Sequence, residues 1–150
     1  MRIAVGADHA GVPLNERIIE ELSRSGHEVI DFGTHDSAAP DDYPDYARMV
    51  GEGIQQGRVE RGILVCGSGV GACVAANKLR GVRACLCHDT YSARQGVEHD
   101  DINVLCLGAR IIGVELALEL LRAFVNVNFT GEERHLRRLA KIAKIEELSG

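Results

Sequence analysis

The chain has 150 residues, of which 45% are hydrophobic, and this is enough for one compact domain with its own core. The formal net charge of -5 excludes a basic surface for a nucleic acid backbone, so we expect no nucleic acid partner. No apolar run approaches the roughly 20 residues that span a bilayer, and five cysteines without framework spacing fit reduced thiols. We therefore expect a soluble, cytoplasmic protein without a membrane partner.

Short apolar runs alternate with helical patterns along the chain. The first strand is predicted at 2–5, and Pro13 suits the first turn of a helix that ends before Gly26. Further strands are predicted at 27–33, 62–66, 82–87 and 103–108. Helices are predicted at 47–56, after the glycines of CGSGVG, at 90–98 and at 113–125. This alternation predicts the α/β class, as a three-layer α/β/α sandwich of about five parallel strands in one domain, residues 1–150.

The last segment, residues 131–150, predicts a helix with one apolar stripe. The stripe consists of Leu136, Leu139, Ile142 or Ala143, Ile145 and Leu148, with charged residues elsewhere. Such a face could pack on the sheet of its own chain or on a second subunit. We favour the second subunit, and hence a C-terminal helix used in dimerisation, because the helix is long and terminal.

Ligands of parallel α/β sheets sit at the carboxyl ends of the strands, and one such end carries a thiol. Cys66 ends a central strand, and the glycine-rich stretch 67–71 leads from it into a helix. Backbone N–H groups and the positive end of the helix dipole then point at the space above the strand, where they favour a thiolate or a developing oxyanion. The alternative remains that Cys66 is a buried structural thiol beside a tight glycine turn.

Two other interpretations of these motifs are disfavoured. The glycines follow a G-x-G-x-G pattern on the third strand, and no acidic residue ends the next strand, which argues against a dinucleotide site. Cys85, Cys87 and His88 contain no C-x-x-C pair, and the strand would bury both cysteines on one face, which argues against structural zinc.

Two acid/base pairs flank predicted strands. Asp8 and His9 end the first strand, and His99 and Asp100 precede the last. We expect both pairs at the same edge of the sheet as Cys66. A thiolate base, an acid/base pair and a pocket of glycine amides are the parts needed to move a proton between two carbons beside a carbonyl, without a metal or redox cofactor.

A basic patch in the terminal helix is a candidate phosphate site. Arg134 and Arg138 are spaced i,i+4 on one helix face, with His135 and Arg137 beside them, and could hold one phosphate. The alternative is a solvated helix face whose arginines pair with glutamates 132 and 133.

The motifs ADHAG, DYPDYA, GILVCGSGVGACVAANK, NVLCLGAR and RHLRRL stand together in one order and spacing. In them the chain resembles, over essentially its whole length, the ribose-5-phosphate isomerase B family, which also holds allose-6-phosphate and galactose-6-phosphate isomerases. The resemblance implies a metal-free and cofactor-free aldose–ketose isomerase with a Rossmann-like sandwich. It also implies a homodimer or a dimer of dimers with sites shared between subunits.

The resemblance further implies catalytic roles. Cys66 is the base that moves the proton between C1 and C2 through a cis-enediol(ate), and the chain resembles the cysteine subtype because Ala72 stands where other members have a glutamate. Asp8 and His99 resemble the residues that open the furanose ring. The loop that stabilises the enediolate consists of Gly67, Ser68, Gly69 and Gly71.

Binding roles follow in the same way. Tyr43 resembles a residue that lines the pocket, and the phosphate is expected to be held by His9, Arg134 and Arg138, with Arg110 as a weaker candidate. Asp100 departs from the asparagine that is common in the family, and a carboxylate there would oppose a developing enediolate.

The leading hypothesis is interconversion of ribose 5-phosphate and ribulose 5-phosphate in the pentose phosphate pathway. The same chemistry on allose 6-phosphate or galactose 6-phosphate is the nearest alternative, because proton transfer is indifferent to one extra carbon. A catalytically silent sugar-phosphate-binding subunit is another, against which Cys66, Asp8 and His99 argue together. A thiol redox sensor is a further one, although no resolving cysteine is evident near Cys66 in the sequence.

Overall fold

Five parallel strands form the centre of the fold, and the computed structural model describes residues 1–149 of the chain, so of the predicted domain only Gly150 lies outside. The strands are β1 (Arg2–Ala7), β2 (Glu28–Asp31), β3 (Arg61–Cys66), β4 (Ala84–Leu86) and β5 (Val104–Gly108). They lie in the order β2-β1-β3-β5-β4, with every neighbouring pair parallel. Cys66 is the last residue of the central strand β3, and it lies beside Gly108 of β5.

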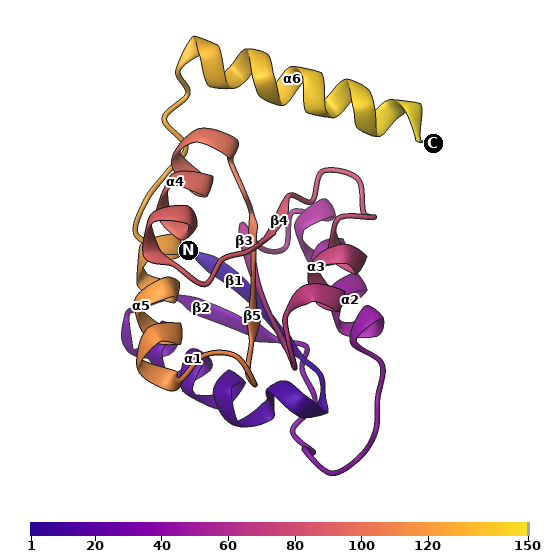
Figure 1. Ribbon diagram of the computed structural model, residues 1–150, viewed down its shortest axis with the longest axis vertical. Coiled ribbons are helices and arrows are strands. Elements are labelled where there is room, and N and C mark those ends of the chain that lie inside the picture. Colours follow the sequence, from indigo (N-terminus) through magenta and orange to yellow (C-terminus); the bar gives the residue numbers. More distant parts are fainter. Residues whose placement is uncertain (150) are drawn as a thin grey trace.

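Helices cover both faces of the sheet (Figure 1). The helices are η1 (His9–Gly11), α1 (Val12–Arg24), α2 (Tyr43–Gln55), α3 (Val70–Ala76), α4 (Thr90–Asp100), α5 (Val114–Val125) and α6 (Glu133–Leu148). Buried residues of α1, α4 and α5 pack in one cluster, and those of α2 and α3 pack in another on the opposite face. The predicted three-layer α/β/α sandwich is therefore confirmed.

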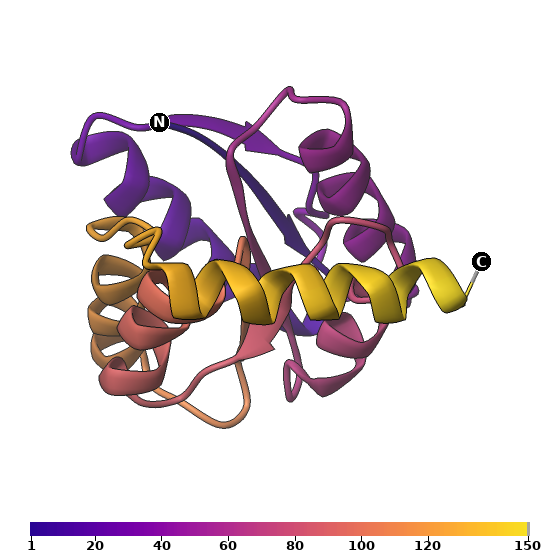
Figure 2. The same cartoon turned by 90° about the horizontal axis from the view of Figure 1, so that it is seen from above.

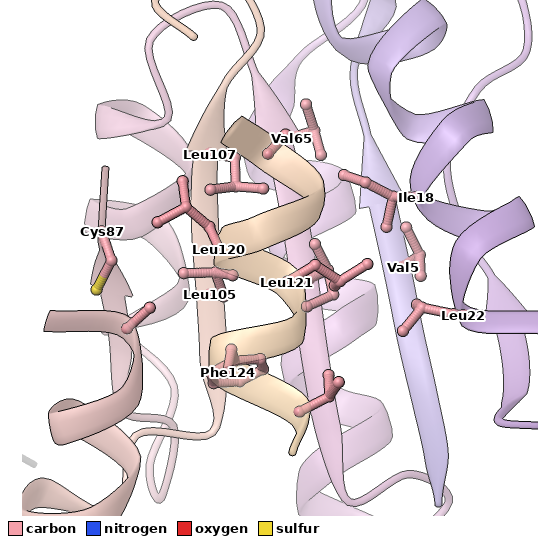
Figure 3. Packing of buried hydrophobic residues seen from close by; sticks show 14 of the residues in the cluster. Val5, Ile18, Leu22, Val65, Cys87, Leu105, Leu107, Leu120, Leu121 and Phe124 are labelled. Carbon is pink, nitrogen blue, oxygen red and sulfur yellow. The ribbon is translucent and has the colours of Figure 1, made fainter. Parts of the chain in front are cut away.

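Alternation along the strands separates the two clusters. Ile63 and Val65 of β3 face α1 and α5, whereas Leu64 and Cys66 face α2 and α3. Figure 3 shows the first cluster, in which Phe124 of α5 is the largest fully buried side chain. The side chain of Cys66 consequently lies on the α2 and α3 side of the sheet.

Several predicted boundaries differ from the structure by one or a few residues, and two of the differences have a clear cause. Helix α2 begins at Tyr43 rather than at residue 47, because Asp42 is extended and Pro44 fits the first turn. Strand β4 is shorter than the predicted 82–87. Arg83 is instead held by its backbone N–H, which donates to Asn103 Oδ1 at 2.7 Å, so the chain joins the ladder only at Ala84.

Helix α6 lies across the end of the molecule where the strands begin, away from their carboxyl ends (Figures 1 and 2). It crosses from the α4 and α5 layer to the α2 and α3 layer. Its apolar stripe remains largely exposed, with Leu136, Ile142, Ile145 and Leu148 at 52%, 47%, 64% and 87% exposure. Among the described residues no helix has the length and apolar composition to cross a membrane.

Candidate active site

A pocket of about 330 Å³ opens at the carboxyl edge of the sheet, where the ends of β1, β3 and β5 meet. It brings together seven of the predicted site residues with one that sequence reasoning missed, Ile111. The lining residues are Asp8, Tyr43, Cys66, Gly67, Ser68, Gly71, Arg110 and Ile111. Gly69 and His9 adjoin this lining in the chain. These predicted residues at the carboxyl ends of the strands therefore line one pocket.

Cys66 meets an amide of the glycine loop. The backbone N–H of Gly69 donates to its Sγ at 3.1 Å, and the residue is 4% exposed. Gly69 has φ +81°, a left-handed conformation that turns the chain sharply into α3. Ser68 Oγ accepts the N–H of Val70 at 3.3 Å, which satisfies another amide of this turn. An amide aimed at the sulfur stabilises negative charge there, as a base requires.

Gly69→Ala is expected to damage both stability and turnover. A Cβ at this position would lie 2.6 Å from Leu86 Cδ1 and 2.9 Å from the carbonyl carbon of Leu107, in addition to the left-handed backbone cost of about 1–2 kcal/mol. Gly26→Ala is the matched control, since Gly26 has φ +87° with no atom within 4 Å. Urea unfolding should show a larger loss of unfolding free energy for Gly69→Ala than for Gly26→Ala. Only Gly69→Ala should lose turnover. Equal behaviour of the two variants would contradict this packing.

Asp8 is fixed at the end of β1 by the backbone that follows it. Its side chain is 6% exposed, and Oδ1 accepts the N–H groups of Ala10 and Gly11 at 3.1 and 3.2 Å, which caps η1. The carboxyl group thus reaches the pocket from a rigid position.

His9 is held by two residues that sequence reasoning missed, Asp41 just before α2 and Tyr46 in its first turns, although both belong to the motif DDYPDY. Asp41 Oδ1 lies 2.6 Å from His9 Nδ1 and accepts the His9 backbone N–H at 2.9 Å, while Tyr46 donates its hydroxyl to Asp41 Oδ2 at 2.7 Å. Burial raises the pKa of Asp41, but the hydrogen bonds from His9 and Tyr46 outweigh it and leave the pKa below its usual value. An ionised Asp41 therefore accepts the proton of Nδ1 and leaves Nε2 of His9 for a ligand.

The ligand atoms of Asp8, His9 and Asp41 all lie within 4.8 Å of one another, which is close enough for a metal ion. Asp8 Oδ1 already accepts two backbone N–H groups, however, and both oxygens of Asp41 accept protein donors. Both oxygens of Asp41 are therefore engaged by hydrogen bonds of the fold, whereas Nε2 of His9 is left for a ligand.

Tyr43 and Arg110 both line the pocket, at different residues of the glycine loop. The ring of Tyr43 packs on the backbone of Gly71, where an added Cβ would lie 2.4 Å from Cζ. Arg110 donates its backbone N–H to Gly67 O at 2.9 Å, and its guanidinium lies beside Gly67. A positive charge thus stands at the glycine loop, as the prediction of a phosphate ligand requires.

The remaining predicted site residues lie elsewhere. His99 and Asp100 are in the last turn of α4, which leads into the beginning of β5, so they stand at the amino edge of the sheet. The expectation that both acid/base pairs share the edge of Cys66 is wrong within one chain, because β5 runs away from His99. Asp100 lines a separate groove of about 760 Å³ beneath α6.

The basic patch on α6 also lies at the amino edge. Arg134 Nε pairs with Glu132 Oε2 at 3.1 Å, and Arg137 pairs with Glu133 at 3.4 Å, so the expected salt bridges exist. His135 was grouped with these arginines on the surface, and this is wrong: the residue is 2% exposed and stacks on His99. The structure therefore contains two clusters of site residues, one at each edge of the sheet.

All five cysteines are free thiols. Cys85 and Cys87 face the same cluster, as predicted. A hydrogen bond from Cys106 lowers the pKa of Cys73 to about 6. Thiol-labelling experiments must therefore separate Cys73 from Cys66.

Comparisons with known proteins agree with this geometry. Residues 3–142 match the Ribose/Galactose Isomerase family. The chain is 43% identical to ribose-5-phosphate isomerase B of Escherichia coli over 97% of each chain. It superposes on ribose-5-phosphate isomerase B of Clostridium thermocellum with a TM-score of 0.96, 43% identity and 100% of each chain covered. The structure of ribose-5-phosphate isomerase B of Mycoplasma genitalium with bound ribulose-5-phosphate superposes with a TM-score of 0.92 and 38% identity. The match covers 97% of this chain and 96% of that one. The chain belongs to the Ribose/Galactose Isomerase family.

Proposed function

We propose that this protein, as a single sugar-phosphate isomerase domain, interconverts D-ribose 5-phosphate and D-ribulose 5-phosphate. The observation that carries the proposal is the position of Cys66, whose Sγ accepts the Gly69 N–H in a pocket that Asp8, Ser68 and Arg110 also line. The Escherichia coli relative is a ribose-5-phosphate isomerase, and the Mycoplasma genitalium enzyme binds ribulose-5-phosphate, which supports the choice of substrate.

Isomerisation needs one base that serves two adjacent carbons. The Cys66 thiolate removes the proton from C2 of the open aldose, and the oxygen at C1 gains a proton, which gives a cis-enediol(ate). Returning the proton to C1, while the hydroxyl at C2 loses its proton and becomes the carbonyl, completes the ketose. The loop from Gly67 to Gly71 supplies amides for the oxygen that becomes negative, and the polarisable sulfur reaches both carbons with little movement. This route uses no redox step and no cofactor.

A second subunit completes the site in this proposal. Asp8, His9, Cys66 and Arg110 stand at one edge of the sheet, whereas the cluster of His99, Asp100, Arg134 and Arg138 stands at the other. A twofold axis can bring the first cluster of one chain to the second cluster of its partner. By symmetry the dimer then contains two equivalent sites. His99 then assists Asp8 in opening the ring, and the phosphate lies among His9, Arg110 and the partner's arginines.

Exposed apolar surface supports this arrangement. Ile111 beside the pocket is 62% exposed, Val70 and Val74 of α3 are 52% and 57% exposed, and the stripe of α6 is equally open. Such surfaces are costly in water and mark interfaces. We therefore propose a homodimer or a dimer of dimers in which α6 packs on the partner. Five free thiols further favour a reducing compartment, the cytoplasm.

Turnover measured in the presence of a chelator tests the proposal. The kcat/KM values for ribose 5-phosphate, allose 6-phosphate and galactose 6-phosphate are compared on the same preparation. We expect a clear preference for the pentose. A preference for a hexose phosphate would show that the proposed substrate is wrong and would make Asp100 the first residue to test. Absence of turnover on all three substrates would indicate a catalytically silent sugar-phosphate-binding subunit. Asp100→Asn, measured beside the wild type, shows whether that carboxylate restrains the rate.

A further inference from the structure

Helix α6 is attached to its own chain by very few residues. Of the whole helix only His135 is buried, and its neighbours in the sequence, Arg134 and Leu136, are exposed. Towards the other end of the helix, Glu146 Oε1 accepts the N–H of Gly81 at 2.9 Å. The end of α6 that carries Arg134 and Arg138 is therefore placed chiefly by His135.

The ring of His135 stacks on the ring of His99. The two centroids are 4.2 Å apart, and the planes differ by 19°. His99 Nδ1 also lies 3.0 Å from the side-chain nitrogen of Gln95, one turn earlier in α4. An amide nitrogen only donates, so Nδ1 accepts and the proton of a neutral His99 lies on Nε2. Gln95 thus sets the direction of the ring, and His135 sets its plane.

Among the described residues, the ring nitrogen Nε2 of His135 makes no hydrogen bond that would explain the burial of the side chain. Its Nε2 has no hydrogen-bond partner among residues 1–149, and the nearest carboxylate oxygen, of Glu132, is 4.0 Å away and already pairs with Arg134. An unpaired buried ring nitrogen is costly, so a compensating role is expected. Stacking on His99 is the contact that this position provides.

The surroundings of His135 keep its ring neutral. Burial lowers the pKa of His135, and the charges of His99, Arg134 and Arg138 lower it further, against a smaller opposing effect of Glu132. A neutral flat ring can lie against His99 in either protonation state, whereas two stacked cations would repel each other. The neutral ring of His135 therefore supports the ring of His99 by stacking.

We infer that His135 is a positioning residue for His99, and that it ties the ring-opening group to the phosphate-binding arginines of the same helix. This rests on the proposed function, in which His99 assists the opening of the furanose. In that step a proton leaves the O1 hydroxyl and another reaches O4 as the C1–O4 bond breaks, so the acid must point at one oxygen. Since His135 stands between Arg134 and Arg138 in α6, the imidazole and the phosphate keep a fixed relation.

Two substitutions separate stacking from mere attachment of α6. His135→Phe keeps a flat ring and removes the unpaired nitrogen, whereas His135→Ala removes the stack. We expect His135→Ala to lower kcat for ribose 5-phosphate about tenfold or more, since misplaced catalytic groups cost up to about 10²-fold. We expect His135→Phe to stay within a few-fold of the wild type.

The reverse reaction provides the specific readout. Ribulose 5-phosphate cannot close a five-membered ring because its O5 carries the phosphate, and the open aldose that it yields can leave and close in water. His135→Ala should therefore lower kcat much less with ribulose 5-phosphate as the substrate than with ribose 5-phosphate as the substrate. The values of kcat/KM in the two directions must fall by the same factor, because their ratio equals the equilibrium constant, so kcat is the quantity to compare. Leu139→Ala, one turn along α6, is the matched control for a loosened helix. It should change kcat by the same factor in both directions.

The outcomes are distinct. The positioning role would be overturned if His135→Ala lowered kcat by the same factor in both directions. It would also be overturned if His135→Phe lowered kcat for ribose 5-phosphate as much as His135→Ala does. A wild type that fails to isomerise ribose 5-phosphate would remove the proposed function instead. In that case the positioning role of His135 can still be tested without substrate, by measuring nuclear Overhauser contacts between the His99 ring and the Gln95 side chain. These should persist in His135→Phe and vanish in His135→Ala, and their persistence in His135→Ala would refute it.

Discussion

Cys66→Ala should abolish turnover of ribose 5-phosphate, with a loss of about 10²–10⁴-fold, which is the contribution of a positioned proton-transfer group. The residue ends β3 with its sulfur under the Gly69 amide and inside the pocket, and the described part of the pocket offers no other thiol to replace it. Binding of the sugar phosphate should remain, because the phosphate ligands are not changed. Initial rates and calorimetric titration with ribose 5-phosphate measure the two quantities separately.

Cys106→Ala is the matched control for this variant. Cys106 is fully buried in the neighbouring strand β5 and packs in the same cluster as Cys66, but it does not line the pocket. Its replacement should cost about 1 kcal/mol of stability through lost packing and leave turnover largely intact. Turnover of Cys66→Ala that stays near the level of Cys106→Ala would remove the thiol from the reaction.

Two inactive variants should restore activity when they share a dimer. Cys66→Ala and His99→Asn remove groups from opposite edges of the sheet, so in a heterodimer one site keeps both Cys66 and His99. In a random mixture about half of the twofold dimers are heterodimers with one intact site each, so about a quarter of wild-type activity should return. Co-expression with two different tags, followed by assays of the mixture and of the purified heterodimer, measures this recovery.

A second mixture controls for nonspecific rescue. Asp8 and Cys66 lie at the same edge of one chain and line one pocket. A heterodimer of Asp8→Asn with Cys66→Ala therefore contains no intact site and should stay inactive. Recovery in this mixture, or no recovery with His99→Asn, would contradict the shared site, and native mass spectrometry verifies that heterodimers formed.

The strands and the glycine loop could be predicted because their signals are local. Val5, Leu64 and Leu107 stand in apolar runs that bounded their strands to within a few residues, and Cys66 was placed correctly at a strand end. The predicted start of α2, at residue 47, is wrong because the polar residues around Pro44 resemble a loop, although proline is favoured in a first turn.

The edge at which His99 lies follows from the order of the elements, and the prediction did not use it. In a parallel sheet a residue that follows a strand lies at the carboxyl edge and one that precedes a strand lies at the amino edge, and His99 precedes β5 whereas Asp8 follows β1. The burial of His135 could not be predicted, since its charged neighbours suggest a solvated face and only packing against α4 covers the ring. The role of Asp41 depends on a loop whose path no periodic pattern specifies.

The separation of the two clusters by the width of the sheet has an evolutionary consequence. In the proposed shared site each chain supplies two separate half-sites, so after gene duplication one copy could lose its thiol edge and the other its arginine edge, while the mixed pair keeps one working centre. Drift would then convert a symmetric enzyme into an obligate pair of unequal subunits without passing through an inactive intermediate. Selection on either copy would act only through the surface that it presents to the other.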